Sequence, residues 1–183
     1  MKTDALINFT CQHSDGWGTG LILQDPTTKK FLLGRRVDTK EWASPGGKCE
    51  MGENPIQAVI RECKEESNVT VNSLKHYDTL LHQSPATNKS WVSFLFYSDD
   101  YDDTDLVGQK EELVDLQYYT LAEVFNLHLF PPTEASFIKL RAILDNQTMQ
   151  EEIPYVDMPS TPSRISSDVN NAYSFIGLTP TIF

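Results

Sequence analysis

Residues 54–66 constrain this chain most, because they specify one amphipathic helix and the place where it begins. Asn54 is a favourable N-cap, Pro55 fits the first helical position, and Gln57 can complete a capping box. The apolar side chains then recur at helical spacing, which predicts that one face of the helix is buried. This apolar stripe consists of Ile56, Val59, Ile60 and Cys63.

Three glutamates of this helix, Glu62, Glu65 and Glu66, fall on one flank that partly adjoins the apolar stripe. Like charges at this spacing repel each other, so they need either full solvation or a cation. Two interpretations stay open: a solvated acidic face, or a site for a divalent cation that prefers oxygen ligands, such as Mg²⁺ or Mn²⁺. The glycine pair at 46–47 leaves backbone carbonyls accessible and Glu53 adds an acid at the helix entrance, which favours the cation site.

Apolar runs before and after this helix in the sequence predict a mixed α/β fold. Strands are expected at residues 17–24, 30–34, 76–81, 91–97 and 113–119. Helices are expected at 121–127 and at 133–145, the second with Thr133 as its N-cap after two prolines. Strands and helices mixed in this order predict a sheet that is covered by helices.

The acidic balance limits the classes of partner. The 183 residues carry a formal net charge of -11, which is unfavourable for binding polynucleotide phosphates, so a nucleic-acid partner is not expected. A small phosphate ligand remains compatible, because a metal ion can supply positive charge. No apolar run is long enough to span a membrane and no signal peptide is recognised, so we expect a cytoplasmic protein with reduced thiols.

The chain is expected to divide into a domain at 1–148 and a Pro/Ser/Thr-rich C-terminal extension at 149–183. Four prolines and a Ser/Thr-rich stretch mark the extension. Its end is nevertheless apolar, with Tyr173, Phe175, Ile176, Leu178 and Phe183. We expect this cluster to dock on the domain or on a second subunit, and the second case would give a homodimer.

The segment from Gly47 to Val69 closely resembles the Nudix box. The matching positions are Gly47, Glu53, Arg61, Glu62, Glu65, Glu66 and Val69. Two positions depart from the pattern: Cys63 stands for an aliphatic residue, and Asn68 stands for a glycine just past the helix. A buried thiol behaves as a small hydrophobe, and Asn is the next best residue for a left-handed helix end. The resemblance covers about residues 15–145 and implies an α/β/α sandwich with a mixed sheet.

The resemblance also implies an activity and a set of site residues. The activity is metal-dependent hydrolysis of the pyrophosphate bond in a nucleoside diphosphate linked to another moiety. Glu62, Glu65 and Glu66 become metal ligands or the base that takes the water proton. Gly46 would offer its backbone carbonyl to Mg²⁺ or Mn²⁺, and Arg61 would orient the glutamates. Glu112 resembles a further metal ligand from a later loop, with its neighbour Glu111 as the competing candidate.

The resemblance leaves the substrate less defined. Pro85 lies close to a proline that marks many ADP-ribose pyrophosphatases, which favours ADP-ribose-like compounds. Arg36 could contact phosphates and Trp91 could stack on a base, with surface exposure and core packing as the respective alternatives. A (d)NTP pyrophosphatase of the nucleotide-sanitising type is the enzymatic alternative, and a non-catalytic nucleotide-sensing module is the other. The Nudix-box glutamates are all present, which argues against the module.

Overall fold

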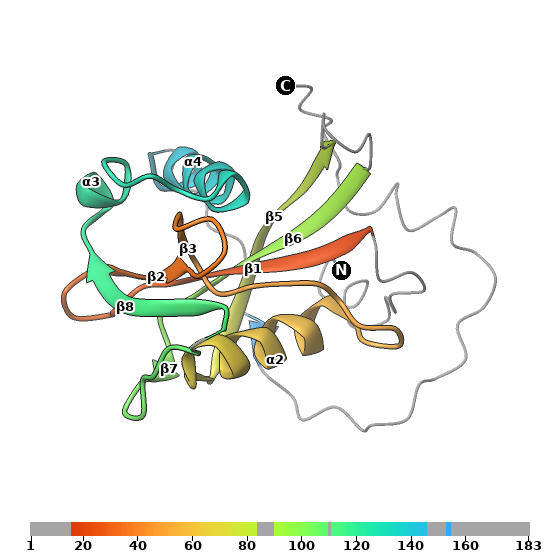
Figure 1. Cartoon of the computed structure of the whole chain (residues 1–183), viewed down its shortest axis with the longest axis horizontal. Helices are drawn as coiled ribbons and strands as arrows, with labels where there is room; N and C mark the ends of the chain where they lie inside the picture. The colour runs from red at the N-terminus through yellow and green to blue at the C-terminus, as the bar shows by residue number, and fades with distance from the viewer. Residues whose placement is uncertain (1–15, 84–89, 110, 146–152, 155–183) are drawn as a thin grey trace.

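The computed structural model describes residues 16–83, 90–109, 111–145 and 153–154. Most of its strands lie between α2 on one side and α3 and α4 on the other (Figure 1). The helices span Pro55–Ser67 (α2), Leu121–Val124 (α3) and Pro131–Asp145 (α4). The expected α/β/α sandwich with a mixed sheet is therefore confirmed.

The largest sheet is mixed and has the strand order β1-β6-β5-β9. Its strands are β1 (Trp17–Leu23), β5 (Ser73–Gln83), β6 (Ser90–Ser98) and β9 (Ile153–Pro154). β1 runs parallel to β6, and β5 runs antiparallel to β6. The two residues of β9 come from the expected extension and pair with Ser73 and Leu74 of β5.

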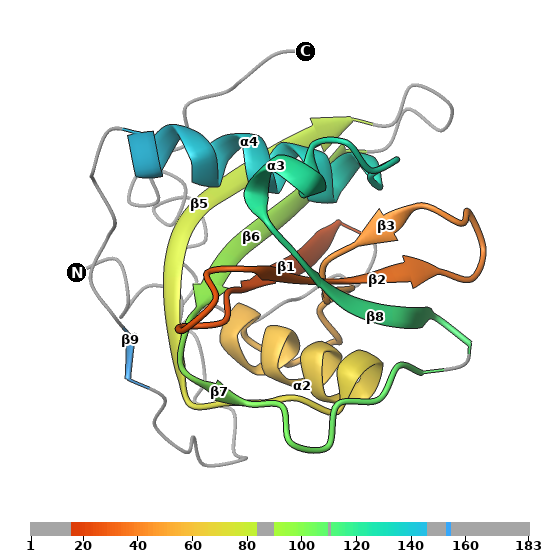
Figure 2. The same cartoon turned by 90° about the vertical axis from the view of Figure 1, so that its left-hand side faces the viewer.

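A second, antiparallel sheet has the order β3-β2-β8 and crosses the first one in Figure 2. Its strands are β2 (Phe31–Arg36), β3 (Trp42–Ala43) and β8 (Leu113–Tyr119). A short antiparallel pair joins β4 (Thr70–Val71), which follows α2 in the sequence, to β7 (Tyr101–Asp102). The strands predicted at 17–24, 30–34, 91–97 and 113–119 are thus confirmed with small shifts at their ends.

Alternate strand residues supply two separate cores, because successive side chains of a strand point to opposite faces. Leu21 and Leu23 of β1 pack with the α2 stripe, whereas Ile22 packs on the other face with Phe137 and Leu140 of α4. The strands are therefore apolar on both faces, as expected for a sheet with helices on both sides.

The sequence signals at both ends of α2 are confirmed. The Asn54 side chain accepts a hydrogen bond from the Gln57 N–H at 2.9 Å, and the Gln57 side chain accepts one from the Asn54 N–H at 3.0 Å. At the other end Asn68 has φ 58° and ψ 14°, the left-handed conformation. Its backbone N–H donates to the Lys64 carbonyl, which closes the last turn.

Three local expectations need correction. Thr133 is not an N-cap: α4 begins two residues earlier at Pro131, because prolines fit the first helical turn, and the Thr133 hydroxyl instead accepts a bond from the Ser44 N–H. The helix expected at 121–127 ends at Val124. The strand expected at 76–81 is only part of β5, which continues through an irregularity between His76 and Asp78.

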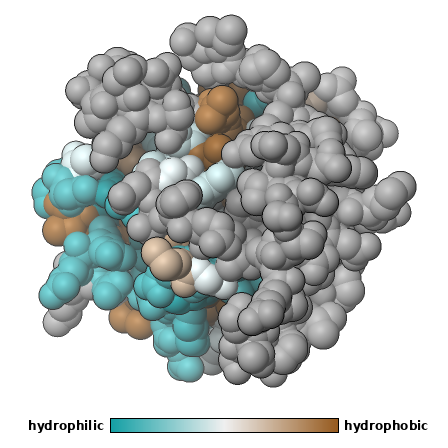
Figure 3. All heavy atoms as spheres, turned by 90° about the vertical axis from the view of Figure 1, so that its right-hand side faces the viewer, coloured by the Kyte–Doolittle hydropathy of each residue, from teal (hydrophilic) through white to brown (hydrophobic). Residues whose placement is uncertain are grey.

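A few large apolar side chains reach the surface. The described ones are Met51, Leu81, Val107, Ile138 and Leu144. On the face shown in Figure 3 the described residues are largely hydrophilic, with hydrophobic residues in small groups. Within the described ranges, no helix combines the length and apolar character needed to cross a bilayer. The predicted apolar cluster at 173–183 lies outside the described residues.

Candidate active site

Two adjacent glycines shape the loop that leads from β3 to α2. A Cβ atom on Gly46, whose φ is +154°, would lie 2.3 Å from the Thr19 carbonyl oxygen. A Cβ atom on Gly47 would lie 2.4–2.6 Å from the carboxylate of Glu62. The backbone of β1 therefore requires glycine at position 46, whereas a side chain at position 47 would displace the carboxylate of Glu62.

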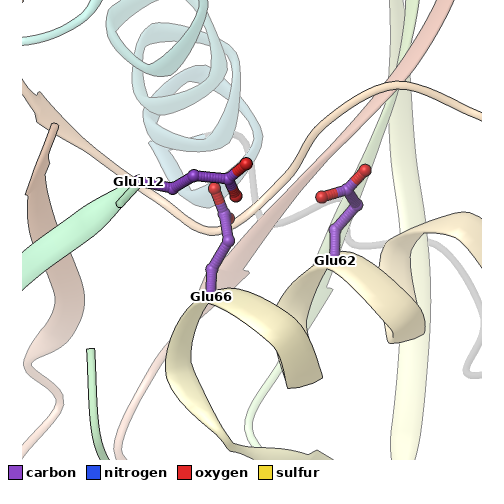
Figure 4. A group of neighbouring side chains, drawn as sticks. All are labelled: Glu62, Glu66 and Glu112. Carbon is purple, nitrogen blue, oxygen red and sulfur yellow. The ribbon is translucent and has the colours of Figure 1, made fainter. Parts of the chain in front are cut away.

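Three carboxylates converge beside this loop. Glu62 and Glu66 are four residues apart on α2 and point in the same direction, and Glu112 reaches over them from the start of β8 (Figure 4). One oxygen of each residue lies within 4.8 Å of the others. The structure therefore brings together two of the predicted helix glutamates with Glu112, the later acid that the resemblance indicated.

Glu65 lies outside this three-carboxylate group. Its side chain is 52% exposed and its Oε2 accepts a hydrogen bond from Arg61 Nη1 at 2.9 Å. The i and i+4 positions of Glu62 and Glu66 place both on the side of α2 that faces the loop, and Glu65 falls toward solvent. Glu111 is exposed and is also absent from the group.

Arg61 holds the acidic flank of α2 in place. Its guanidinium donates to Glu53 through Nε at 2.8 Å and Nη2 at 3.0 Å, and to Glu62 Oε1 through Nη1 at 3.0 Å. Nη2 also donates to the Lys48 carbonyl at 2.9 Å. Burial raises the pKa of Glu53, but bonds from Arg61 and the Glu50 N–H outweigh it and lower that pKa. This supports the expected orienting role of Arg61, with Glu53 as its anchor.

Glu66 is the most buried of the three carboxylates, with 4% of the residue exposed. Burial raises the pKa of Glu66 to about 8, and the charges of Glu62 and Glu112 act in the same direction. The Gly46 N–H donates to Glu66 Oε2 at 2.8 Å and opposes this rise. Burial also raises the pKa of Glu62, against the attraction of Arg61. Two neighbouring acids with raised pKa values, one buried and one partly buried, indicate negative charge that the surrounding protein compensates incompletely.

The donor set fits a hard divalent cation. Three carboxylate oxygens gather at one point, and the family resemblance adds the Gly46 carbonyl as a fourth oxygen. Oxygen ligands of this kind suit Mg²⁺ and Mn²⁺ and are unsuited to softer metals. A cation there would also balance the charge of the buried Glu66 carboxylate.

A pocket opens directly beside Glu66. Its lining includes Gly46 and Glu66 from the acidic side, Arg36 from β2, and hydroxyl residues from three elements. These hydroxyl residues are Thr19 of β1, Ser93 of β6, Thr133 and Ser136 of α4, together with Ser44 from the loop after β3. A pocket with both polar and apolar lining, next to an acidic cluster, can hold the remainder of a molecule whose anionic group lies against the cluster.

Arg36, a predicted phosphate contact, lines this pocket in an ordered position. Its guanidinium carbon lies 4.4 Å from the centre of the Phe130 ring, and it donates to both carboxylate oxygens of Asp38 at 2.9 Å and 2.7 Å. The bonds to Asp38, followed by the charges of Asp38 and Glu66, raise the pKa of Arg36 against desolvation. Arg36 is therefore a fixed positive charge near Glu66.

Trp91, the predicted base-stacking residue, is half-buried near the glycine loop. A Cβ atom on Gly18 would lie 2.7 Å from its Nε1, and the Lys48 amine lies 5.5 Å from its ring centre. Trp17, by contrast, stacks on Phe94 in the α2 core. Pro85 lies outside the described residues.

Several pocket residues carry no signal in the sequence. Three of them come from the region where α4 begins: Phe130, Thr133 and Ser136. Thr133 lies 89 positions after Ser44, the residue to which it is hydrogen-bonded. Small hydroxyl residues are common in any chain, so only the folded arrangement identifies them. Ser44 is different, because its position two residues before the glycine pair could have indicated in the sequence that it lies near the site.

The chain is similar in sequence to a known protein family. The NUDIX domain model matches residues 15–140. The chain belongs to the Nudix family. An uncharacterized Nudix hydrolase of Bacillus subtilis (strain 168) is 32% identical over 116 residues, which cover 62% of this chain and 71% of that protein. The 8-oxo-dGTP diphosphatase of Escherichia coli (strain K12) is 34% identical over 67 residues, which cover 35% of this chain and 52% of that enzyme.

Solved structures show the same fold. The NUDIX domain of Shewanella oneidensis NrtR, a structure complexed with ADP ribose, has a TM-score of 0.62 at 19% identity. The similarity covers 79% of this chain and 99% of that one. Together with the family match, the fold and the diphosphatase among its relatives identify the chain as a Nudix-type pyrophosphohydrolase.

Proposed function

We propose that this Nudix enzyme hydrolyses the pyrophosphate bond of a nucleoside diphosphate linked to another moiety, with ADP-ribose-like compounds as the first substrate class. One observation carries the proposal: the carboxylates of Glu62, Glu66 and Glu112 converge beside a pocket that Glu66 itself lines. The preference for ADP-ribose-like compounds rests on the sequence position of Pro85.

In this proposal Glu62, Glu66, Glu112 and the Gly46 carbonyl hold Mg²⁺ or Mn²⁺. A divalent cation supplies positive charge against the phosphate oxygens and so favours attack by water. Arg61 keeps Glu62 in place, because it bonds both that carboxylate and Glu53. Arg36 binds a phosphate oxygen, for which it can exchange one of its bonds to the exposed Asp38.

The reaction forms a bond between the water oxygen and one phosphorus and breaks the anhydride bond on the same phosphorus. The proton of the water passes to a carboxylate, for which Glu62, Glu65 and Glu66 are the candidates. Glu62 and Glu66 lie in the three-carboxylate group, whereas Glu65 lies on its solvent side. Separate substitution of each glutamate measures its contribution to kcat.

A (d)NTP pyrophosphatase is the second candidate. The similarity to the 8-oxo-dGTP diphosphatase of Escherichia coli favours it, although that similarity covers about half of the relative. The two candidates differ in their products. An ADP-ribose-like substrate gives two phosphate monoesters, and a nucleoside triphosphate gives a nucleoside monophosphate and pyrophosphate.

The test is a substrate panel with identified products. The purified chain is incubated with Mg²⁺ or Mn²⁺ and ADP-ribose, dinucleoside polyphosphates, or oxidised and unmodified dNTPs, and products are resolved by chromatography and mass spectrometry. The first proposal is supported if the wild-type chain forms AMP and ribose 5-phosphate from ADP-ribose and the Glu62→Gln variant forms neither product. Selective conversion of a dNTP to monophosphate and pyrophosphate supports the second candidate. Absence of metal-dependent hydrolysis across the panel contradicts both.

A further inference from the structure

Asn68 makes a contact that the glycine of the family pattern could not make. Its backbone is left-handed, a conformation that Asn adopts more readily than most residues. Its side-chain Nδ2 donates a hydrogen bond to the carbonyl oxygen of Asp105 at 2.9 Å. The side chain therefore ties the C-terminal end of α2 to a segment 37 positions later in the chain.

Two backbone hydrogen bonds continue this connection. The Val107 N–H donates to the Ser67 carbonyl and the Gln109 N–H donates to the Glu66 carbonyl, both at 3.1 Å. Carbonyls in the last turn of a helix have no partner within the helix, and residues 105–109 supply partners for two of them. We call residues 105–109 the docking segment.

The docking segment leads directly to Glu112. The Glu112 N–H donates to the Gln109 carbonyl at 3.2 Å, and the Glu112 carbonyl accepts a bond from the Val37 N–H at 2.9 Å. A Cβ atom on Gly108 would lie 2.7 Å from the Leu113 carbonyl oxygen, so the segment is folded tightly against the start of β8. The backbone that carries Glu112 is therefore held on two sides, by Gln109 of the docking segment and by Val37 at the end of β2.

We propose that Asn68 is a positioning residue that sets the place of Glu112 relative to Glu62 and Glu66. Two of the three carboxylates share α2, so their separation is fixed by the helix. Glu112 comes from another element, and its distance from them depends both on the pairing of β8 with β2 and on how residues 105–109 dock on the end of α2. The inference rests on the proposed function, because it assigns Asn68 a role toward the cation site.

One substitution isolates this contact. Among the three bonds between α2 and the docking segment described above, the bond from Asn68 alone uses a side chain. Asn68→Gly removes it and leaves a residue that adopts the left-handed backbone without strain, so the variant should fold. Asn72→Gly is the matched control, because its Nδ2 donates to Asp100 Oδ1 at 3.0 Å on a neighbouring turn and not to the docking segment.

The experiment measures hydrogen exchange in the metal-free protein and Mn²⁺ affinity by electron paramagnetic resonance. In Asn68→Gly the amides of Val107 and Gln109 should exchange about two- to tenfold faster, the range for loss of one net hydrogen bond. Mn²⁺ should bind more weakly by about the same factor. Asn72→Gly should change neither quantity.

The outcomes separate this inference from the proposed function. Unchanged exchange at Val107 and Gln109, or faster exchange with unchanged Mn²⁺ affinity, overturns the role of Asn68. A wild-type chain that binds no Mn²⁺ contradicts the proposed function itself, and the role of Asn68 toward the site falls with it.

Discussion

The burial of Glu66 predicts how the stability of the metal-free enzyme depends on pH. The pKa of Glu66 is raised in the folded protein to about 8 from 4.5. Below pH 4.5 both the folded and the unfolded chain hold the proton, and above pH 8 neither does. Between these values the unfolded chain has lost a proton that the folded chain retains, so stability falls as pH rises.

The size of the effect follows from linkage at 1.36 kcal/mol for each unit of pKa. Between pH 5 and pH 8.5, Glu66 should lower the free energy of unfolding by about 4 kcal/mol, a large part of the total stability of a typical domain. Glu66→Gln keeps an oxygen that can accept the Gly46 N–H and removes the charge. The variant should therefore lack this fall and exceed wild type in stability at pH 8.5.

The assay is urea unfolding followed by tryptophan fluorescence, in chelator-treated buffer from pH 5 to pH 8.5. The difference between wild type and Glu66→Gln isolates this carboxyl from other titrating groups. Glu111→Gln serves as the matched control at an exposed position. Parallel curves for wild type and Glu66→Gln would refute the reasoning. Saturating Mg²⁺ or Mn²⁺ should stabilise wild type more at pH 8.5 than at pH 5, because binding requires the ionised carboxylate.

Three further predictions concern single residues. Glu62→Gln should lower kcat by at least about 10²-fold, and Glu65→Gln should lower it less, because Glu65 lies outside the three-carboxylate group. Equal losses in steady-state kinetics would contradict this order. Gly46→Ala should destabilise the fold by several kcal/mol in urea unfolding, because its Cβ would meet backbone atoms. Gly47→Ala should mainly displace the Glu62 side chain and weaken Mn²⁺ binding. The reverse pattern would contradict the loop geometry. Arg36→Ala should raise KM by about tenfold, the value of one charged hydrogen bond, and an unchanged KM would remove Arg36 from the substrate site.

The sequence predicted the helix of the site well because its signals are local. Asn54, Pro55 and Gln57 specify the start of α2, and Asn68 is suited to its end. β8 also begins and ends at the residues expected from its apolar and aromatic run. Caps and apolar spacing act over a few positions, so they can be read without knowledge of distant contacts.

The composition of the three-carboxylate group could not be read in the same way. Helical spacing places Glu62, Glu65 and Glu66 on one arc, but only the glycine loop and β8 determine which of them face inward. The choice between Glu111 and Glu112 depends on contacts far away in sequence, among them the bond from the Val37 N–H to the Glu112 carbonyl. The stacking of Arg36 on Phe130 likewise joins positions that have no local relation.

The central claim is that Glu62, Glu66 and Glu112 together bind a divalent cation. Calorimetric titration of Mn²⁺ into metal-free wild type, Glu112→Gln and Glu111→Gln tests it most directly, because the two variants differ by one position in the chain. We predict that Glu112→Gln weakens binding by about tenfold or more, as expected for loss of a charged ligand, and that Glu111→Gln binds like wild type. Wild-type affinity in Glu112→Gln, or a larger loss in Glu111→Gln, would contradict the claim.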